Sequence, residues 1–91
     1  MRVEGIWEKI DRVERSITIY VALPIIIKNV TSSIEYRIIL SRLAEVTWDK
    51  YYRKRIIKCV HDIHDNKSRF CCILGVLGFL KLGEKYCKQD R

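Results

Sequence analysis

The chain contains few residues that interrupt regular secondary structure. Its 91 residues include one proline, Pro24, and four glycines, of which only Gly5 precedes residue 75. Sandwiches and barrels of many short strands need more turn residues than this, so both folds are excluded. The length excludes large α/β enzyme folds, because a chain of this size buries about 60–65% of its unfolded surface around one core. We therefore expect one domain over residues 1–91.

The sequence also lacks a hydrophobic run long enough to cross a bilayer. Its two longest uncharged stretches, residues 16–27 and 70–80, have 12 and 11 residues, whereas a membrane span needs roughly 18–20. Residues 1–15 mix acidic with basic side chains and do not resemble a signal peptide. We therefore expect an intracellular protein, cytoplasmic or nuclear, in which the sequon at Asn29 is accidental.

No motif typical of catalysis or cofactor binding is present. The late glycines lie in apolar sequence, not in a loop between a strand and a helix, so no phosphate-binding loop is expected. Cys59, His61 and His64, followed by Cys71 and Cys72, superficially resemble a zinc site. On a helix, however, Cys59 would point nearly opposite to His61, and adjacent cysteines can hardly bind the same ion. We expect no enzyme activity, no cofactor and no metal.

Four cysteines, Cys59, Cys71, Cys72 and Cys87, could form two disulfides through three pairings. Adjacent residues of a helix point to different faces, so Cys71 and Cys72 would need different partners. Intracellular proteins keep thiols reduced, and a free cysteine packs as a small apolar residue. We expect reduced core thiols, with disulfides as the alternative for a protein of a hyperthermophilic archaeon.

Aliphatic residues dominate the composition. Ile, Leu, Val and Phe together supply 30 residues, which excludes a disordered chain. Isoleucine outnumbers alanine fourteen to two, although alanine has the higher helix propensity. This bias indicates coding pressure in an AT-rich genome, as in many viruses and archaea.

Apolar residues at spacings of three and four predict an amphipathic helix over residues 3–22. The residues that carry this pattern are Val3, Ile6, Trp7, Ile10, Val13 and Ile17. Pro24 disfavours helical geometry at Leu23 and predicts a break or a kink. The β-branched residues in 17–21 make a short strand the competing prediction, but no second strand is visible to pair with it.

A second helix is predicted to begin at Ser32. Ser32 and Glu35 have the spacing of a capping box, in which the hydroxyl accepts from the N3 amide and the glutamate binds the Ser32 amide. Apolar residues continue at helical spacing as far as Ile63, with an interruption near Thr47. One long helix and two helices broken near Thr47 both fit.

A turn at residues 65–68 precedes the last predicted helix, with Asn66 or Ser68 as its cap. Residues 70–80 are apolar on most sides, which indicates a central or oligomer-facing helix. Gly75 and Gly78 suggest a close backbone approach or a local loop, and Gly83 predicts a stop before a polar tail over residues 84–91.

These patterns together predict an all-α bundle of three to five helices. A helix that is apolar on most sides is hard to cover within one short chain, so we expect self-association. The expected oligomer interface comprises Phe70, Leu74, Leu77 and Phe79.

Basic residues form the strongest functional candidate. The 18 Lys and Arg residues outnumber the 11 Asp and Glu residues, giving a net charge of +7 that attracts polyanions. A helix over residues 48–63 would bury the face that carries Trp48, Tyr52, Ile56, Cys59 and Ile63. The opposite face would present a basic strip with one aromatic side chain: Lys50, Tyr51, Arg53, Lys54 and Lys58.

This strip predicts nucleic-acid binding, with the cations on phosphates and Tyr51 stacked on a base or sugar. Two other partners fit the same charge. One is an acidic protein, which would make the chain an adaptor or a viral antagonist of a host protein. The other is an anionic membrane surface bound peripherally. An ordinary solvated helix face is the remaining interpretation.

Overall fold

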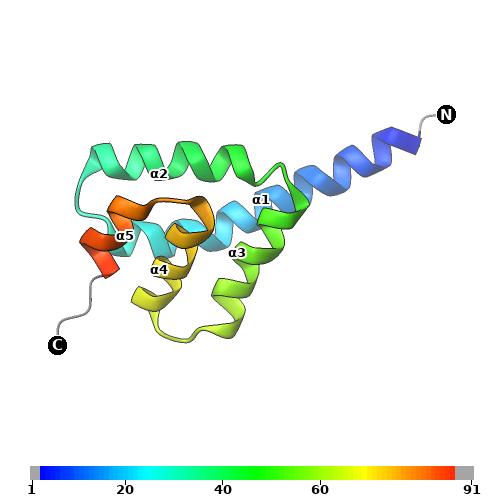
Figure 1. Ribbon diagram of the computed structural model, residues 1–91. Helices are drawn as coiled ribbons and strands as arrows, with labels where there is room; N and C mark the ends of the chain where they lie inside the picture. Colours follow the sequence, from blue (N-terminus) through cyan, green and yellow to red (C-terminus); the bar gives the residue numbers. More distant parts are fainter. Residues whose placement is uncertain (1–2, 88–91) are drawn as a thin grey trace.

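Five helices and no strand make up residues 3–87, the part of the chain that the computed structural model describes (Figure 1). The helices are α1 (Val3–Asn29), α2 (Ser33–Val46), α3 (Lys50–Asp62), α4 (Asn66–Leu77) and α5 (Leu80–Cys87). The predicted all-α bundle is thus confirmed, and its self-association stays a prediction. None of these helices is both long and apolar enough to cross a membrane.

Helix α4 is the centre of the bundle and packs against each of the other four helices. Phe70, Leu74 and Leu77 are buried in the core of a single copy, and Phe79 is partly buried against it. The prediction that these four residues form an oligomer interface is therefore wrong. The cause is topological, because four neighbours from the same chain cover the apolar surface of α4.

Helix α1 continues through Pro24 to Asn29, so the predicted end near residue 22 is wrong, and of the predicted break or kink at Pro24 the break does not occur. The preference for helix over strand at residues 17–21 is confirmed. Proline removes the hydrogen bond to the carbonyl four residues earlier, that of Tyr20. Tyr20 and Pro24 both lie on an exposed side of α1, where water can satisfy that carbonyl.

The first turns of α1 project beyond the other helices (Figure 1). The Cα radius of gyration is 14.2 Å, against about 12 Å expected for a compact domain of this length. We call residues 3–13 the arm. The remainder of α1 is packed in the body, where Thr18, Ala22 and Ile26 are fully buried.

Of the two alternatives for this region, the structure has two helices interrupted near Thr47. Helix α2 ends at Val46, and the Thr47 hydroxyl donates to the Leu43 carbonyl at 2.7 Å. The predicted capping box is only half formed. Ser32 Oγ accepts from the Glu35 amide at 3.4 Å. The Glu35 carboxylate instead accepts from Lys85 Nζ at 2.8 Å and from the Tyr86 hydroxyl. These bonds, that of Lys85 foremost, lower the pKa of Glu35 and attach α5 to α2.

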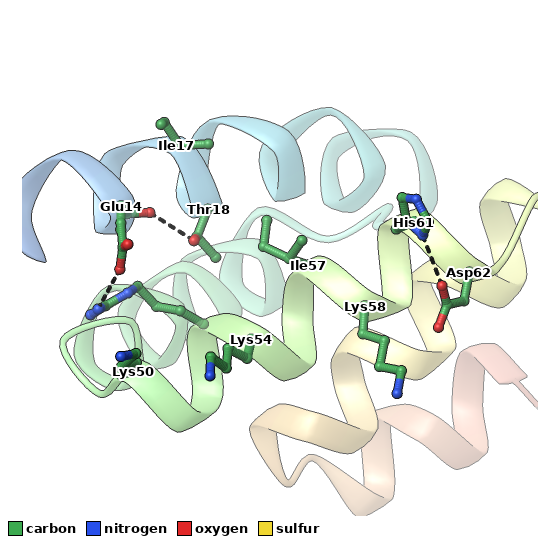
Figure 2. Close-up of a pocket in the computed structure, with 10 residues that line it drawn as sticks. Glu14, Ile17, Thr18, Lys50, Lys54, Ile57, Lys58, His61 and Asp62 are labelled. Carbon is green, nitrogen blue, oxygen red and sulfur yellow. Dashed lines mark hydrogen bonds and ion pairs between the residues drawn. The ribbon is translucent and has the colours of Figure 1, made fainter. Parts of the chain in front are cut away.

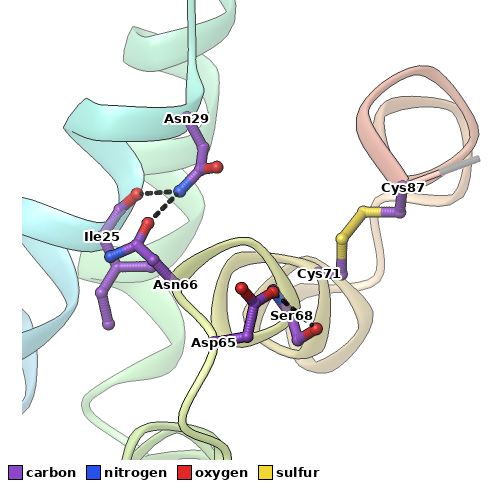
Figure 3. Close-up of a disulfide and its surroundings, with 7 residues drawn as sticks. All are labelled: Ile25, Asn29, Asp65, Asn66, Ser68, Cys71 and Cys87. Carbon is purple, nitrogen blue, oxygen red and sulfur yellow. Dashed lines mark hydrogen bonds between the residues drawn. A yellow bond between two sulfur atoms is a disulfide. The ribbon is translucent and has the colours of Figure 1, made fainter.

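Helix α4 begins and ends at local capping motifs. Its N-cap is Asp65, not Asn66 or Ser68 as predicted, and the Asp65 carboxylate accepts from the Ser68 amide at 2.9 Å (Figure 3). The pKa of Asp65 is lowered by that amide bond. Gly78, with φ of 85°, ends α4 in the left-handed conformation that glycine adopts without strain. The predicted helix over residues 70–80 is therefore interrupted by a loop.

Two disulfides hold the C-terminal half together, so the prediction of reduced thiols is wrong. Cys59 of α3 bonds Cys72 of α4. Cys71 of α4 bonds Cys87 of α5, as Figure 3 shows. The expectation that Cys71 and Cys72 need different partners is confirmed. The helix hairpin of α3 and α4 places Cys59 beside Cys72, whereas α5 packs on another side of α4, where it meets Cys71.

The polar tail predicted from residue 84 is wrong for residues 84–87. Gly83 lies inside α5, which extends to the disulfide at Cys87. Residues 88–91 of the predicted tail lie outside the described residues. Gly75 also differs from expectation, because a Cβ at this position would have no neighbouring atom within 4 Å. No backbone approaches Gly75 closely.

Candidate functional site

A groove of about 540 Å³ lies between α1 and α3 and contains most of the predicted basic strip (Figure 2). Its walls combine three acidic or polar residues from α1 and α3, two isoleucines and five basic or imidazole side chains. The lining residues are Glu14, Ile17, Thr18, Lys50, Arg53, Lys54, Ile57, Lys58, His61 and Asp62.

Three lysines form a row along the α3 wall of this groove. Lys50, Lys54 and Lys58 are exposed and lie four residues apart, which separates successive Cα atoms by about 6 Å along the helix axis. The helix that carries them begins at Asp49, whose carboxylate accepts from the Tyr51 amide at 2.8 Å. We call Lys50, Lys54 and Lys58 the lysine row.

Arg53 does not belong to the exposed strip, contrary to the prediction. It is 4% exposed and its Nη2 donates to Asp11 at 2.9 Å and to Glu14 at 2.8 Å. Its Nη1 donates to the Thr47 carbonyl at 3.0 Å. The two carboxylates on one turn of α1 attract this guanidinium, so Arg53 fixes α3 against α1 and is not available to a ligand.

A second arginine, Arg15, connects α1 to α2 and to the turn that precedes α3. Arg15 of α1 donates through Nη2 to the Ala44 carbonyl of α2 at 2.9 Å. Its guanidinium also lies 4.2 Å from the ring centroid of Trp48, which precedes α3. Sequence periodicity gave no indication of either contact. Arg15 and Arg53 together set the position of α1 relative to the α2–α3 corner.

Arg55 is exposed, although the predicted strip omits it. Its guanidinium lies 5.5 Å from the ring centroid of Tyr51, which is itself 62% exposed as predicted. The buried residues of α3 are Arg53, Ile56 and Cys59, and the centre of this face lies about 40° around the helix from the centre of the predicted inner face. This rotation explains both why the predicted strip included Arg53 and why it omitted Arg55. The sequence signal that could have shown the burial of Arg53 is the pair of carboxylates, Asp11 and Glu14, three residues apart on α1.

The groove is positively charged because four Lys and Arg side chains line it against two carboxylates, and both carboxylates bond neighbours other than the lysines. Glu14 accepts from Arg53, and Asp62 bonds His61 Nδ1 at 2.8 Å (Figure 2). Lys50, Lys54 and Lys58 make no ion pair with any carboxylate in residues 5–87. Three ammonium groups therefore lie along one side of the groove without an ion-pair partner among those residues.

The floor of the groove is apolar. Ile57 of α3 is 36% exposed and points toward α1, whereas Ile17 of α1 is 53% exposed and lies at the outer rim of the groove (Figure 2). The surface thus offers cations above an aliphatic strip, so a ligand that combines negative charge with apolar atoms can contact both.

The residues that superficially resemble a zinc site are not brought together. Cys59, Cys71 and Cys72 are all in disulfides and cannot supply thiolate ligands. His61 bonds Asp62, and His64 is exposed. Within the described residues, no three His, Cys, Asp or Glu side chains are placed to hold a metal ion.

Comparison with known proteins adds no relative to this description. No protein-family model matches the chain, and neither a curated protein nor a solved structure matches it. The groove and the lysine row are therefore the features that bear on function.

Proposed function

We propose that the protein binds nucleic acid through the lysine row of α3 and catalyses no reaction. The observation that carries the proposal is the row itself, in which three exposed lysines on consecutive turns make no ion pair with a described carboxylate. Ammonium groups spaced along one line can follow the phosphates of one strand. The net charge of +7 adds a long-range attraction for the same ligand.

Two further side chains extend this surface. Tyr51 and Arg55 are exposed on the outward side of α3, next to the lysine row. An exposed tyrosine can stack on a base, and an arginine can bind a phosphate with two hydrogen bonds. Contacts of these types do not read base edges in a groove, so the proposed binding is insensitive to sequence.

The apolar floor favours a second candidate, an acidic amphipathic helix of a partner protein. Such a helix would place aliphatic side chains on Ile17 and Ile57 and its carboxylates beside the lysine row. A peripheral contact with anionic lipids would use the lysine row without the floor. Binding assays with nucleic acid, anionic vesicles and an acidic helical peptide separate these ligands.

The two disulfides restrict where the protein is proposed to act. Intracellular disulfides are rare except in hyperthermophilic organisms, and disulfides are common in secreted proteins. An intracellular location therefore fits best with a hyperthermophilic archaeal host, from a viral or a cellular gene. In any other host, the disulfides favour an oxidising compartment.

The test compares two double charge reversals that change the net charge equally. Lys54→Glu with Lys58→Glu alters the lysine row, whereas Lys67→Glu with Lys81→Glu alters exposed lysines of α4 and α5. Affinity for duplex DNA, duplex RNA and anionic vesicles is measured at low and high salt. We expect the first variant to lose nucleic-acid affinity and to reduce the salt slope by about one unit for each lost phosphate contact.

The control variant should retain most of the affinity and the slope. Equal losses in both variants would show that only the total charge matters, which contradicts a defined site. Failure of the parent protein to bind nucleic acid at low salt overturns the proposal, whether or not it binds vesicles. Binding of an acidic helical peptide with contacts to Ile57 would then support the second candidate.

A further inference from the structure

Helix α1 has two separate apolar faces, and only one of them is used by the fold. The buried face comprises Thr18, Ala22, Ile25 and Ile26. The exposed face, which we call the α1 stripe, comprises Ile6, Ile10, Val13 and Ile17. At 100° per residue, the centres of the two faces are more than 90° apart around the helix. The stripe is therefore not the edge of the core but a second surface.

The α1 stripe is large for a surface exposed to water. Its four side chains are 40–58% exposed. At on the order of 100 Å² for each side chain, they present roughly 400 Å² of apolar surface, which is in the range of the largest patches on monomers, patches that are often functional. That area is about half of the approximately 800 Å² that each partner contributes to a standard interface.

The spacing of the α1 stripe is the same in both directions along the chain. Successive members are four, three and four residues apart. Two antiparallel copies therefore match, with Ile6 opposite Ile17 of the second copy and Ile10 opposite Val13. Alternating spacings of three and four are those of helices that pack side by side at a small angle.

The residues beside the α1 stripe are compatible with the same pairing. In the antiparallel register, Trp7 lies near Glu14 of the second copy, and Lys9 lies near Ser16 of the second copy. No like charges face each other across the contact. Projection of the arm beyond the body also leaves room for a second arm (Figure 1). A second copy of this chain thus matches the stripe in spacing, charge and accessibility.

We propose that the protein forms a two-fold dimer in which the α1 stripes of two copies pack antiparallel. The dimerisation is independent of the proposed function, whereas its consequence for ligand binding rests on the proposed function. The interface is small, so we expect dissociation on dilution below the micromolar range.

The symmetry of this dimer determines where the two lysine rows lie. The two-fold axis of an antiparallel helix pair stands perpendicular to the plane of the two helices. Asp11, Glu14 and Thr18 face α3, and they lie about a quarter turn from the stripe around α1. Helix α3 therefore lies on one side of that plane in the first copy. Rotation about the two-fold axis leaves the α3 of the second copy on the same side. Both lysine rows therefore lie on one side of the dimer, where they can contact one ligand.

The first experiment measures the oligomeric state by sedimentation from about 1 to about 500 μM. We expect a dimer for the parent protein and a monomer for Ile10→Asp. At concentrations where the parent is also monomeric, the two melting temperatures should be equal, because Ile10 is outside the core. Ile34→Asp, at an exposed position of α2, is the matched control and should remain dimeric. A monomeric parent over the whole range, or a dimeric Ile10→Asp variant, overturns the proposal.

The second experiment tests the orientation. An equimolar mixture of Ile6→Cys and Ile17→Cys chains should form a cross-linked heterodimer on mild oxidation, because the antiparallel register brings these positions together. Ile6→Cys alone should not cross-link, since its two copies would be about 16 Å apart along the axis. Cross-linking of Ile6→Cys to itself would show a parallel pair and overturn the antiparallel arrangement.

The third experiment separates the dimer from the proposed function. If both lysine rows contact one duplex, Ile10→Asp should weaken nucleic-acid binding by a factor of about 100 or more, although its lysine row is unchanged. Equal binding by the Ile10→Asp monomer and the parent dimer would overturn the shared face. A dimer that binds no nucleic acid would instead overturn the proposed function and leave the pairing of the stripes supported.

Discussion

The two halves of α1 differ in their surroundings more than in their sequence pattern. Both halves repeat aliphatic residues at spacings of three and four. In the second half, Ala22 and Ile26 are fully buried, whereas Ile6 and Val13 in the arm are more than half exposed. Helical periodicity therefore identifies an apolar face but does not tell whether the same chain covers it. Each prediction below compares the body with the arm or with an exposed neighbour.

The largest effect is expected from reduction of both disulfides, which enclose α4 in the body and leave the arm untouched. The cysteine pairs are separated by 13 and 16 residues, and closure of a loop of that length stabilises a protein by about 3 kcal/mol. Loss of both should lower the melting temperature by roughly 20–40 °C. The measurement is thermal unfolding followed by circular dichroism, with and without a reductant.

A thiol titration provides the control for this result. Denatured protein that has not been reduced should show no free thiol, and reduced protein should show four. Four thiols before reduction, together with an unchanged melting temperature, would restore the interpretation of reduced core cysteines.

The next effect compares two isoleucines of α1 directly. Ile26→Ala should lower the free energy of unfolding by about 2–5 kcal/mol, because Ile26 is completely buried and its truncation leaves a cavity. Ile10→Ala in the arm should change it by less than about 0.5 kcal/mol at concentrations where the protein is monomeric. Chemical denaturation of both variants checks this difference, and equal losses would mean that the arm is packed.

A smaller effect is expected where adjacent basic residues of α3 are compared. Arg53→Met should destabilise the fold by about 1–3 kcal/mol, since it leaves the Thr47 carbonyl and two carboxylates of α1 without their donor. The lower part of this range allows for the half-exposed positions of those carboxylates. Lys54→Met should be nearly neutral in the same unfolding assay. A neutral Arg53→Met would place Arg53 back among the exposed cations.

The smallest effect is a gain in stability. Gly75 lies inside α4 with free space around it, so Gly75→Ala should raise the free energy of unfolding by about 0.5–1 kcal/mol. Gly5 in the arm also has no neighbour within 4 Å. Gly5→Ala should nevertheless leave global unfolding almost unchanged, because the arm contributes little to the cooperative core. Equal gains would indicate that the arm unfolds together with the body.

Local features of the sequence were sufficient to predict part of this structure. The start of α2 at Ser32 depends on a hydrogen bond within a few residues, and the sequence displays both partners of this bond. For the interruption near Thr47, the sequence left one long helix and two helices as alternatives, and the structure has two. The positions of Lys50, Lys54 and Tyr51 on an exposed side of α3 follow from helical spacing alone.

Features that depend on contacts between distant segments could not be predicted in this way. The burial of Arg53 requires the carboxylates of Asp11 and Glu14, about forty positions earlier, and helical spacing assigned Arg53 to the solvent. Helix α4, which carries Phe70 and Leu77, packs against all four other helices of the same chain. The sequence does not show these contacts, so the apolar side chains of α4 were predicted to lie at an oligomer interface. Likewise, the disulfide of Cys87 with Cys71 requires that the chain turn at Gly78, so that α5 packs against α4.

The adjacent cysteines at positions 71 and 72 make the covalent structure tolerant of breaks in the chain. Residues 63–65 lie within the loop that Cys59 and Cys72 close, and residues 78–79 lie within the loop that Cys71 and Cys87 close. A protease that cuts either connection, or both, therefore leaves every fragment attached through this dipeptide. The nicked molecule would keep its mass on a non-reducing gel and separate into pieces only after reduction.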